Sequence, residues 1–172
     1  DNTQLPAHQS DYIDGGAGIN TAIYLSYYSD YKITANSNHS ITISTDVTAE
    51  GPDELLNIQR LVFKDKSIAI DVNGNAGTVA KILSAIFGKE YLSNKQYVGF
   101  CLHLLDSGIS DLSLATTVLN AAHLTTNDEI VSTLLKNTLG TVASVSDKTL
   151  LLDMLNKGIS PSELVLMEAN TP

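Results

Sequence analysis

The chain has 172 residues, of which 43% are hydrophobic, so it can bury the core of one good-sized domain or of two small ones. Its formal net charge of -9 argues against binding to nucleic acid or to an anionic membrane, because either polyanion would repel it. A single cysteine, Cys101, excludes an internal disulfide framework, and no apolar run approaches the roughly 20 residues of a membrane span.

The first residues, 1–4, have neither the basic nor the apolar region of a signal peptide. The chain starts without Met and opens on a polar segment that contains proline. We therefore expect it to be the C-terminal portion of a longer protein whose export is signalled elsewhere. The acidic balance is typical of a secreted or cation-binding protein.

A glycine motif comes first in the chain. Residues 11–22 fit the calcium-binding nonapeptide of the parallel β-roll, G-G-x-G-x-D-x-U-x, with Asn20 at the aspartate position. Glycines allow a tight turn whose carbonyls point inward, and acidic oxygens from a stacked turn complete a cage for a hard cation. The alternative is a plain glycine turn that leads into a strand. The calcium ligands that the motif predicts are Asp11, Asp14, Gly16, Gly18 and Asn20.

Residues 22–70 have the patterns of strands. Apolar and polar residues alternate around Ile33 and again around Ile43, and the turn-forming residues 36–39 between them predict a β-hairpin. After a break at residues 50–53, a further apolar stretch leads through a turn at 64–66 to a last short strand around Ile68.

Five tyrosines lie between Tyr12 and Tyr31. Tyrosines on alternating strands are half-buried packing residues whose hydroxyls reach water, and this is the interpretation we favour. The alternative is a ligand-binding surface, with carbohydrate as the ligand, formed by the segment 24–31.

The segment 71–77 joins two kinds of structure, because the apolar spacing changes there from two residues to between three and four. Asp71, Asn73 and Asn75 alternate like the first ligands of an EF-hand loop, but Ile82 occupies the place of the bidentate glutamate, which excludes a complete EF-hand. One hypothesis is that Asp71 and Asn73 bond turn amides while Asn75 caps a helix that begins near Ala76. The other is that these oxygens form a weak calcium site.

Beyond residue 77 the apolar residues recur at helical spacing in six stretches. Start signals are Ser110 or Asp111, the capping box of Thr126 and Glu129, and the run Ser160-Pro161-Ser162-Glu163. Glycines end four of the stretches, and we expect two of them to hold left-handed C-cap conformations, Gly108 and Gly158. The four glycines are Gly88, Gly108, Gly140 and Gly158.

The helical part contains an internal repeat. Residues 104–110 return as residues 154–160, with Gly-Ile-Ser at the end of each copy. We therefore predict an α+β fold with two domains. Residues 1–72 are a β-rich segment, the end of a parallel β-roll plus a hairpin, and residues 73–172 are a bundle of about six helices in two three-helix repeats.

The glycine motif at 15–18, the strand segment 58–63 and the joint at 71–77 together resemble the C-terminal region of secreted bacterial RTX (repeats-in-toxin) proteins. The helical part resembles an uncharacterised domain that often follows such arrays and is itself similar to phycobilisome linker domains, which are helical assembly modules. This resemblance covers nearly the whole chain. It implies type I secretion, calcium as the cofactor, and a location outside the cell or on its surface.

Neither a zinc-binding H-E-x-x-H nor a G-x-S-x-G nor a P-loop occurs in the sequence, and the four histidines have no ligand spacing. We therefore expect a non-catalytic structural and interaction module that caps a β-roll. Its expected partners are the upstream part of its own parent chain and, beyond that, other protein subunits or glycans. The alternative is a carbohydrate- or ligand-binding module of a secreted adhesin or enzyme.

Overall fold

The fold is known from a computed structural model that describes residues 10–46, 51–139 and 144–171. The chain divides into two compact units, Asp1–Asp71 and Val72–Pro172, which we name the β unit and the helical unit. Two small sheets in the first unit and six α-helices in the second confirm the predicted α+β class.

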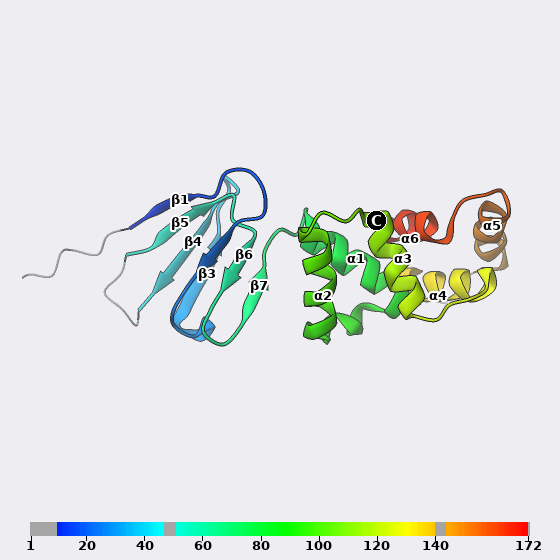
Figure 1. Cartoon of the computed structure of the whole chain (residues 1–172), viewed down its shortest axis with the longest axis horizontal. Coiled ribbons are helices and arrows are strands. Elements are labelled where there is room, and N and C mark those ends of the chain that lie inside the picture. Colours follow the sequence, from blue (N-terminus) through cyan, green and yellow to red (C-terminus); the bar gives the residue numbers. More distant parts are fainter. Residues whose placement is uncertain (1–9, 47–50, 140–143, 172) are drawn as a thin grey trace, which may run out of the picture. The chain divides into compact units, whose positions relative to one another are not determined.

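The larger sheet of the β unit has four strands in the order β1-β5-β4-β3 (Figure 1). Strands β1 and β5 are parallel, whereas β4 is antiparallel to both of its neighbours, β5 and β3. The predicted hairpin is β3–β4, with Ile33 opposite Ile43. The strands are β1 (Tyr12–Asp14), β3 (Tyr31–Ala35), β4 (Ile41–Thr45) and β5 (Asp53–Leu56).

The smaller sheet has the order β2-β6-β7, in which β2 (Thr21–Ile23) is parallel to β6 (Arg60–Val62). The last predicted strand is present as β7 (Ser67–Ala69), and it forms an antiparallel hairpin with β6. A short 3-10 helix, η1 (Tyr28–Asp30), precedes β3.

The parallel pairs reveal two stacked coils of chain. In the first coil β1 passes through a glycine turn into β2, and in the second β5 passes through a shorter turn into β6. Each strand of the first coil pairs in parallel with the corresponding strand of the second. This is the local architecture that the glycine motif predicts. Along the chain, the hairpin β3–β4 separates the first coil from the second.

Four buried residues form the centre of the β unit, one from each of β4, β5 and β6 and one that follows β6. They are Ile43, Leu55, Leu61 and Phe63. The ring of Phe63 has three tyrosine rings around it at centroid separations of 5.3–5.5 Å, those of Tyr24, Tyr28 and Tyr31. The rings of Tyr24 and Tyr31 are 5.0 Å apart. Packing is therefore confirmed for these three tyrosines.

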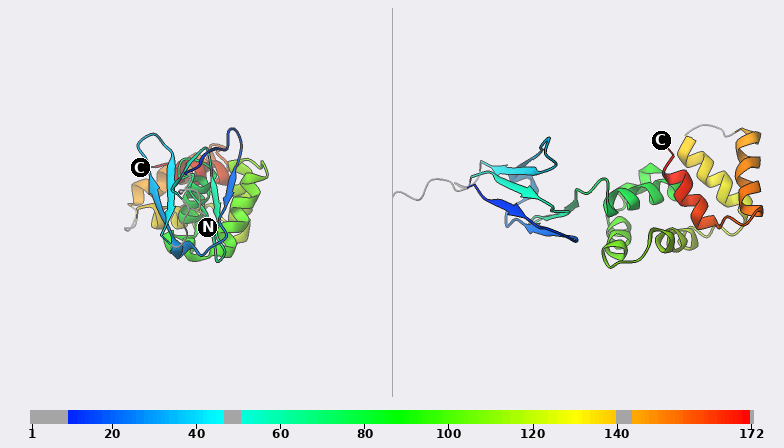
Figure 2. Two further views of the ribbon diagram at one scale, coloured as in Figure 1. Left: turned by 90° about the vertical axis from the view of Figure 1, so that its left-hand side faces the viewer. Right: turned by 90° about the horizontal axis from the view of Figure 1, so that it is seen from above.

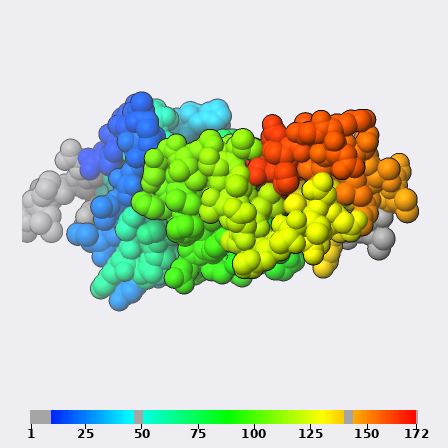
Figure 3. Space-filling view, turned by 45° about the vertical axis from the view of Figure 1, so that its right-hand side comes forward, coloured from blue at the N-terminus to red at the C-terminus, as the bar shows by residue number. Residues whose placement is uncertain are grey.

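The helical unit contains α1 (Asn75–Phe87), α2 (Lys95–Asp106), α3 (Asp111–Ala121), α4 (Asn127–Leu139), α5 (Val145–Asn156) and α6 (Pro161–Ala169), with a 3-10 helix, η2 (Lys89–Ser93), after α1. Its two halves, α1 to α3 and α4 to α6, correspond to the predicted three-helix repeats. They pack on each other through helices at equivalent positions, since α1 contacts α4 and α3 contacts α6. Figure 2 shows α6 in red beside α4 in yellow, and in Figure 3 the red surface of α6 adjoins the yellow-green surface of α3.

The repeat extends to the caps. Gly108 and Gly158 have φ of 92° and 105°, and each donates its N–H to a carbonyl three residues earlier, so both C-cap predictions are confirmed. Ser110 and Ser160 then cap the next helix by accepting from the amide three residues on. The predicted box of Thr126 and Glu129 is formed as well, whereas Gly140 lies outside the described residues.

One predicted cap is wrong. The first helix begins at Asn75 itself, with Gly74 at its N-cap position and no side-chain cap bond. The Asn75 side chain instead donates to Asp106 Oδ1 over 2.9 Å, which ties the start of α1 to the end of α2. A partner 31 residues away could not be read from the local pattern, because only local neighbours decide a capping signal.

No helix within the described ranges is both long enough and apolar enough to span a bilayer.

Candidate functional site

The predicted calcium motif is located where the two coils stack. We name it the turn pair and define it as residues 15–20 of the first coil and residues 57–59 of the second. Gly15 N donates to Leu56 O over 2.9 Å, and a Cβ built on Gly15 would lie 2.5 Å from Asn57 O. Only glycine permits this approach of the two backbones.

The backbone conformation of the turn pair explains why its first turn has glycine at two further positions. Gly16 and Gly18 have φ of 69° and 94°, in the left-handed region that glycine enters without steric cost. Asn57 also has a positive φ, 56°, and asparagine is among the few other residues that adopt it readily. The sequence motif therefore indicated the shape of the first turn correctly.

Asp14 joins the two turns through its carboxylate. Its Oδ1 accepts from Asn57 Nδ2 over 2.7 Å and from Gly16 N over 2.9 Å. These two donors, the Asn57 amide first, lower the pKa of Asp14 below its ordinary value. The carboxylate is thus satisfied by N–H groups of both coils.

Asn20 occupies the position at which the motif has aspartate. Its side-chain Nδ2 donates to Asn57 O over 3.0 Å, and longer contacts of 3.4 and 3.5 Å reach the carbonyls of Gly16 and Ala17. Its backbone N–H donates to Gln59 Oε1 over 2.8 Å, and its carbonyl accepts from the amides of Gln59 and Arg60. One residue thus bonds both turns through its side chain and its backbone.

The structure brings Asp14, Gly16 and Asn20 together but not all of the predicted ligands. Asp11 is exposed at the start of the first coil, where its backbone carbonyl accepts from Glu54 N. Gly18 contributes its conformation to the turn. Within the ranges that the structure describes, no three histidine, cysteine, aspartate or glutamate side chains are grouped closely enough to hold a metal ion.

The predicted ligands at the joint have other partners. Asp71 forms an ion pair with Arg60, and the two side chains are only 12% and 11% exposed. Asn75 bonds Asp106, as described above, and Asn73 is exposed. The hypothesis that Asp71 bonds turn amides did not anticipate Arg60, which lies 11 residues earlier on a strand.

The sequence motif did not predict two residues of the turn pair, Asn57 and Gln59. The glycine motif covers the first coil alone, and the second coil has no glycine that would mark it as a related turn. A signal was nevertheless present, because Asn-Ile-Gln lies between two short apolar stretches that match β5 and β6.

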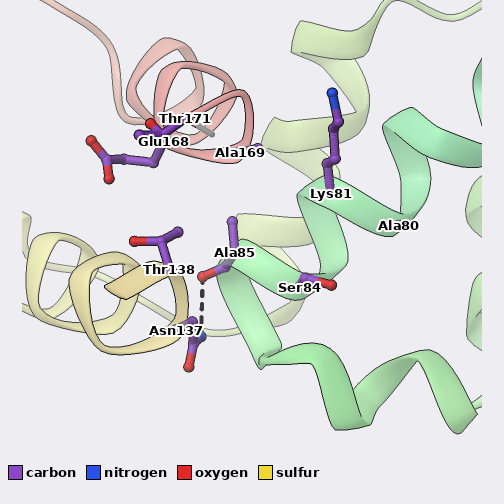
Figure 4. Close-up of a pocket in the computed structure, with 9 residues that line it drawn as sticks. All are labelled: Ala80, Lys81, Ser84, Ala85, Asn137, Thr138, Glu168, Ala169 and Thr171. Atoms are coloured by element: carbon purple, nitrogen blue, oxygen red, sulfur yellow. Dashed lines mark hydrogen bonds between the residues drawn. The ribbon is translucent and has the colours of Figure 1, made fainter. Parts of the chain in front are cut away.

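The helical unit has a surface pocket of about 360 Å³ between α1, α4 and α6 (Figure 4). Its polar lining is engaged in helix packing: Asn137 Nδ2 donates to Ala85 O, and Lys81 Nζ donates to Asn170 Oδ1, each over 3.0 Å. Burial raises the pKa of Glu168, which lines the same pocket. Figure 4 shows the Lys81 and Glu168 side chains pointing away from each other, so they do not converge on a common ligand.

The outer edge of the first coil is a second candidate surface. Strands β1 and β2 are each at the end of their sheet, with one hydrogen-bonded neighbour among the described strands. Apolar side chains on and beside them are exposed, including Tyr12 at 63%, Ile23 at 69% and Leu25 at 87%. Unpaired edges with apolar side chains readily accept another strand.

No family model, curated protein or solved structure matches this chain.

Proposed function

We propose that the chain is a non-catalytic structural module that ends a parallel β-roll of RTX type in a secreted bacterial protein. One observation carries the proposal. The only parallel strands in the described ranges are those of the two stacked coils, and the first coil supplies one terminal strand to each sheet, β1 and β2. A further coil could therefore continue both sheets at once on that side.

The opposite side of the β unit is built differently. On this side, the neighbour of β5 in the larger sheet is the antiparallel strand β4, and β3 lies next to β4. In the smaller sheet, the neighbour of β6 is the antiparallel strand β7. Antiparallel neighbours change the direction of the sheet and interrupt the stacking of coils. The β unit thus accepts parallel coils at one edge and terminates them at the other, as a capping element does in a repeat protein.

The backbone bonds identify the groups that a preceding coil would use. In β1, Asp11 O and Gly15 N face β5, so the alternation of a strand directs the amides of Tyr12 and Asp14 to the free edge. In β2, Asn20 O and Tyr24 N face β6, which leaves the amides of Thr21 and Ile23 at the free edge. The upstream part of the parent chain is the proposed occupant of this edge.

Amide hydrogen exchange tests the proposal by comparing this chain with one that also carries its natural preceding residues. The amides of Tyr12, Asp14, Thr21 and Ile23 should exchange fast in the first and become protected in the second. The inward amides of Ile13 and Ala22 are the matched internal control and should be protected in both. Fast exchange of the four edge amides in the longer chain would contradict the proposal.

A glycan site in the segment 24–31 is the second candidate function. Tyr27 is 49% exposed, and residues of the same segment, Asp30 and Tyr31, line a polar surface pocket of about 470 Å³ together with Lys32 and Asp46. An exposed aromatic ring beside polar groups is suited to a sugar ring. Glycan-array binding that is lost in Tyr27→Ala and kept in Tyr12→Ala would favour this function.

A further inference from the structure

The turn pair is placed where the RTX resemblance implies a calcium ion, and its donor set can be compared with what calcium requires. Calcium takes six to eight oxygen ligands, several of them from carboxylates. Here the carbonyls of Asn57, Gly16 and Ala17 face the Nδ2 group of Asn20, which is a hydrogen-bond donor. The residues present do not fit a calcium ion.

We propose that the side-chain amide of Asn20 replaces the cation and holds the two coils together without a metal. An amide NH₂ presents two hydrogens with partial positive charge to acceptor oxygens, as a cation would, but it is covalently part of the chain. The Asn57 carbonyl belongs to the second coil and the Gly16 and Ala17 carbonyls to the first, so this one group bonds both turns.

The charges of the site agree with this assignment. The carboxylate of Asp14, which precedes the turn pair, already bonds both of its turns, since Asp14 Oδ1 accepts from Gly16 N and Asn57 Nδ2. An aspartate at position 20 would direct a second carboxylate at carbonyl oxygens and toward the same turn as Asp14. Without a cation, these oxygens would repel one another.

The inference does not depend on the proposed function, because it concerns bonds within the β unit and not the occupant of its free edge. It predicts that the thermal unfolding of the chain is the same in millimolar calcium and in excess chelator. Asn20→Ala should lower the melting temperature of the β unit by roughly 4–8 °C for each kcal/mol lost, equally in both conditions.

The decisive variant is Asn20→Asp, with Ser37→Asp as the control that adds the same charge at an exposed turn of the same unit. In chelator, Asn20→Asp should melt below the natural chain, and added calcium should raise its melting temperature by mass action. The melting temperature of Ser37→Asp should be close to that of the natural chain in chelator and should not rise with calcium.

Three results would overturn the inference. The first is a calcium-dependent melting temperature of the natural chain. The second is an Asn20→Ala variant that melts like the natural chain, which would show that the amide ties nothing together. The third is an Asn20→Asp variant that is as stable as the natural chain in chelator. If Asn20→Asp does not fold, the first two comparisons still decide the matter.

Discussion

The helical unit and the β unit differ in the size of their buried apolar cores. In the helical unit every α-helix contributes buried side chains to one cluster, and equivalent helices of the two repeats face each other. The β unit has a centre of four buried residues, while Tyr12, Ile23 and Leu25 at one edge are exposed. A large buried core stabilises a unit without a neighbour, whereas an open sheet edge gains stability from one.

The largest expected effect comes from separating the units. A fragment of residues 72–172 should unfold cooperatively on heating, because its apolar stripes face one another and most of its helices carry their own caps. A fragment of residues 10–71 should be much less stable. Circular dichroism melts of the two fragments measure this difference, and a helical fragment without a cooperative transition would refute the contrast.

Core truncations in the full chain should act on one unit at a time. Leu134→Ala in α4 and Leu61→Ala in β6 each remove a side chain that is 0% exposed, at an expected cost of about 2–5 kcal/mol. Leu150→Ala and Leu25→Ala, at exposed positions of the same two units, are the matched controls and should cost less than about 0.5 kcal/mol.

Residue-resolved denaturant titrations by NMR distinguish the two units in these variants. Leu134→Ala should shift the midpoint of the helical unit alone, and Leu61→Ala that of the β unit alone. A shift of both midpoints by either substitution would mean that the units unfold as one.

The capping signals show how much of the fold is readable from the sequence. Ser110, Thr126 with Glu129, and Ser160 with Glu163 act within three residues, and all form as predicted. The two hairpins follow from similarly local turns. The parallel pairing of β1 with β5 joins residues about 40 positions apart, and no local pattern specifies such a partner.

The candidate site was predictable in part for the same reason. Gly16 and Gly18 indicate the first turn, since their positive φ values are local requirements. Gly15 is needed for the approach of Asn57 O from the second coil, which no local pattern specifies. Asn57 and the ion pair between Arg60 and Asp71 depend on which coil lies next to which, so they required the tertiary structure.

Two helix glycines of the helical unit should respond to alanine in opposite directions. A Cβ on Gly77 in α1 would lie 1.9 Å from Val72 O, so Gly77→Ala should destabilise the unit by about 1–3 kcal/mol. Gly99 in α2 has nothing within 4 Å of that position, so Gly99→Ala should stabilise it by about 0.5–1 kcal/mol. Urea titrations of both variants provide the comparison, and equal signs would contradict it.

Acid should produce the smallest effect. Glu163 accepts hydrogen bonds from the Ser160 hydroxyl and, with a smaller effect, from the Ser160 backbone amide, and these bonds lower the pKa of Glu163. Bonds from Thr126 and Thr125 lower the pKa of Glu129 in the same way. A lowered folded-state pKa gives stability above the unfolded value, which is lost as the pH falls through the folded value. Glu163→Gln should therefore flatten the fall in helical-unit stability below about pH 4.5, measured by urea titrations over pH. If the stability of Glu163→Gln falls with pH as steeply as that of the natural chain, Glu163 does not contribute to the acid sensitivity.

The most direct test of the open edge is to measure the unfolding of both units with and without the natural preceding residues. If a preceding coil covers β1 and β2, the midpoint of the β unit rises in the longer chain while that of the helical unit stays constant. An unchanged midpoint of the β unit would contradict the account, as would an equal rise of both midpoints.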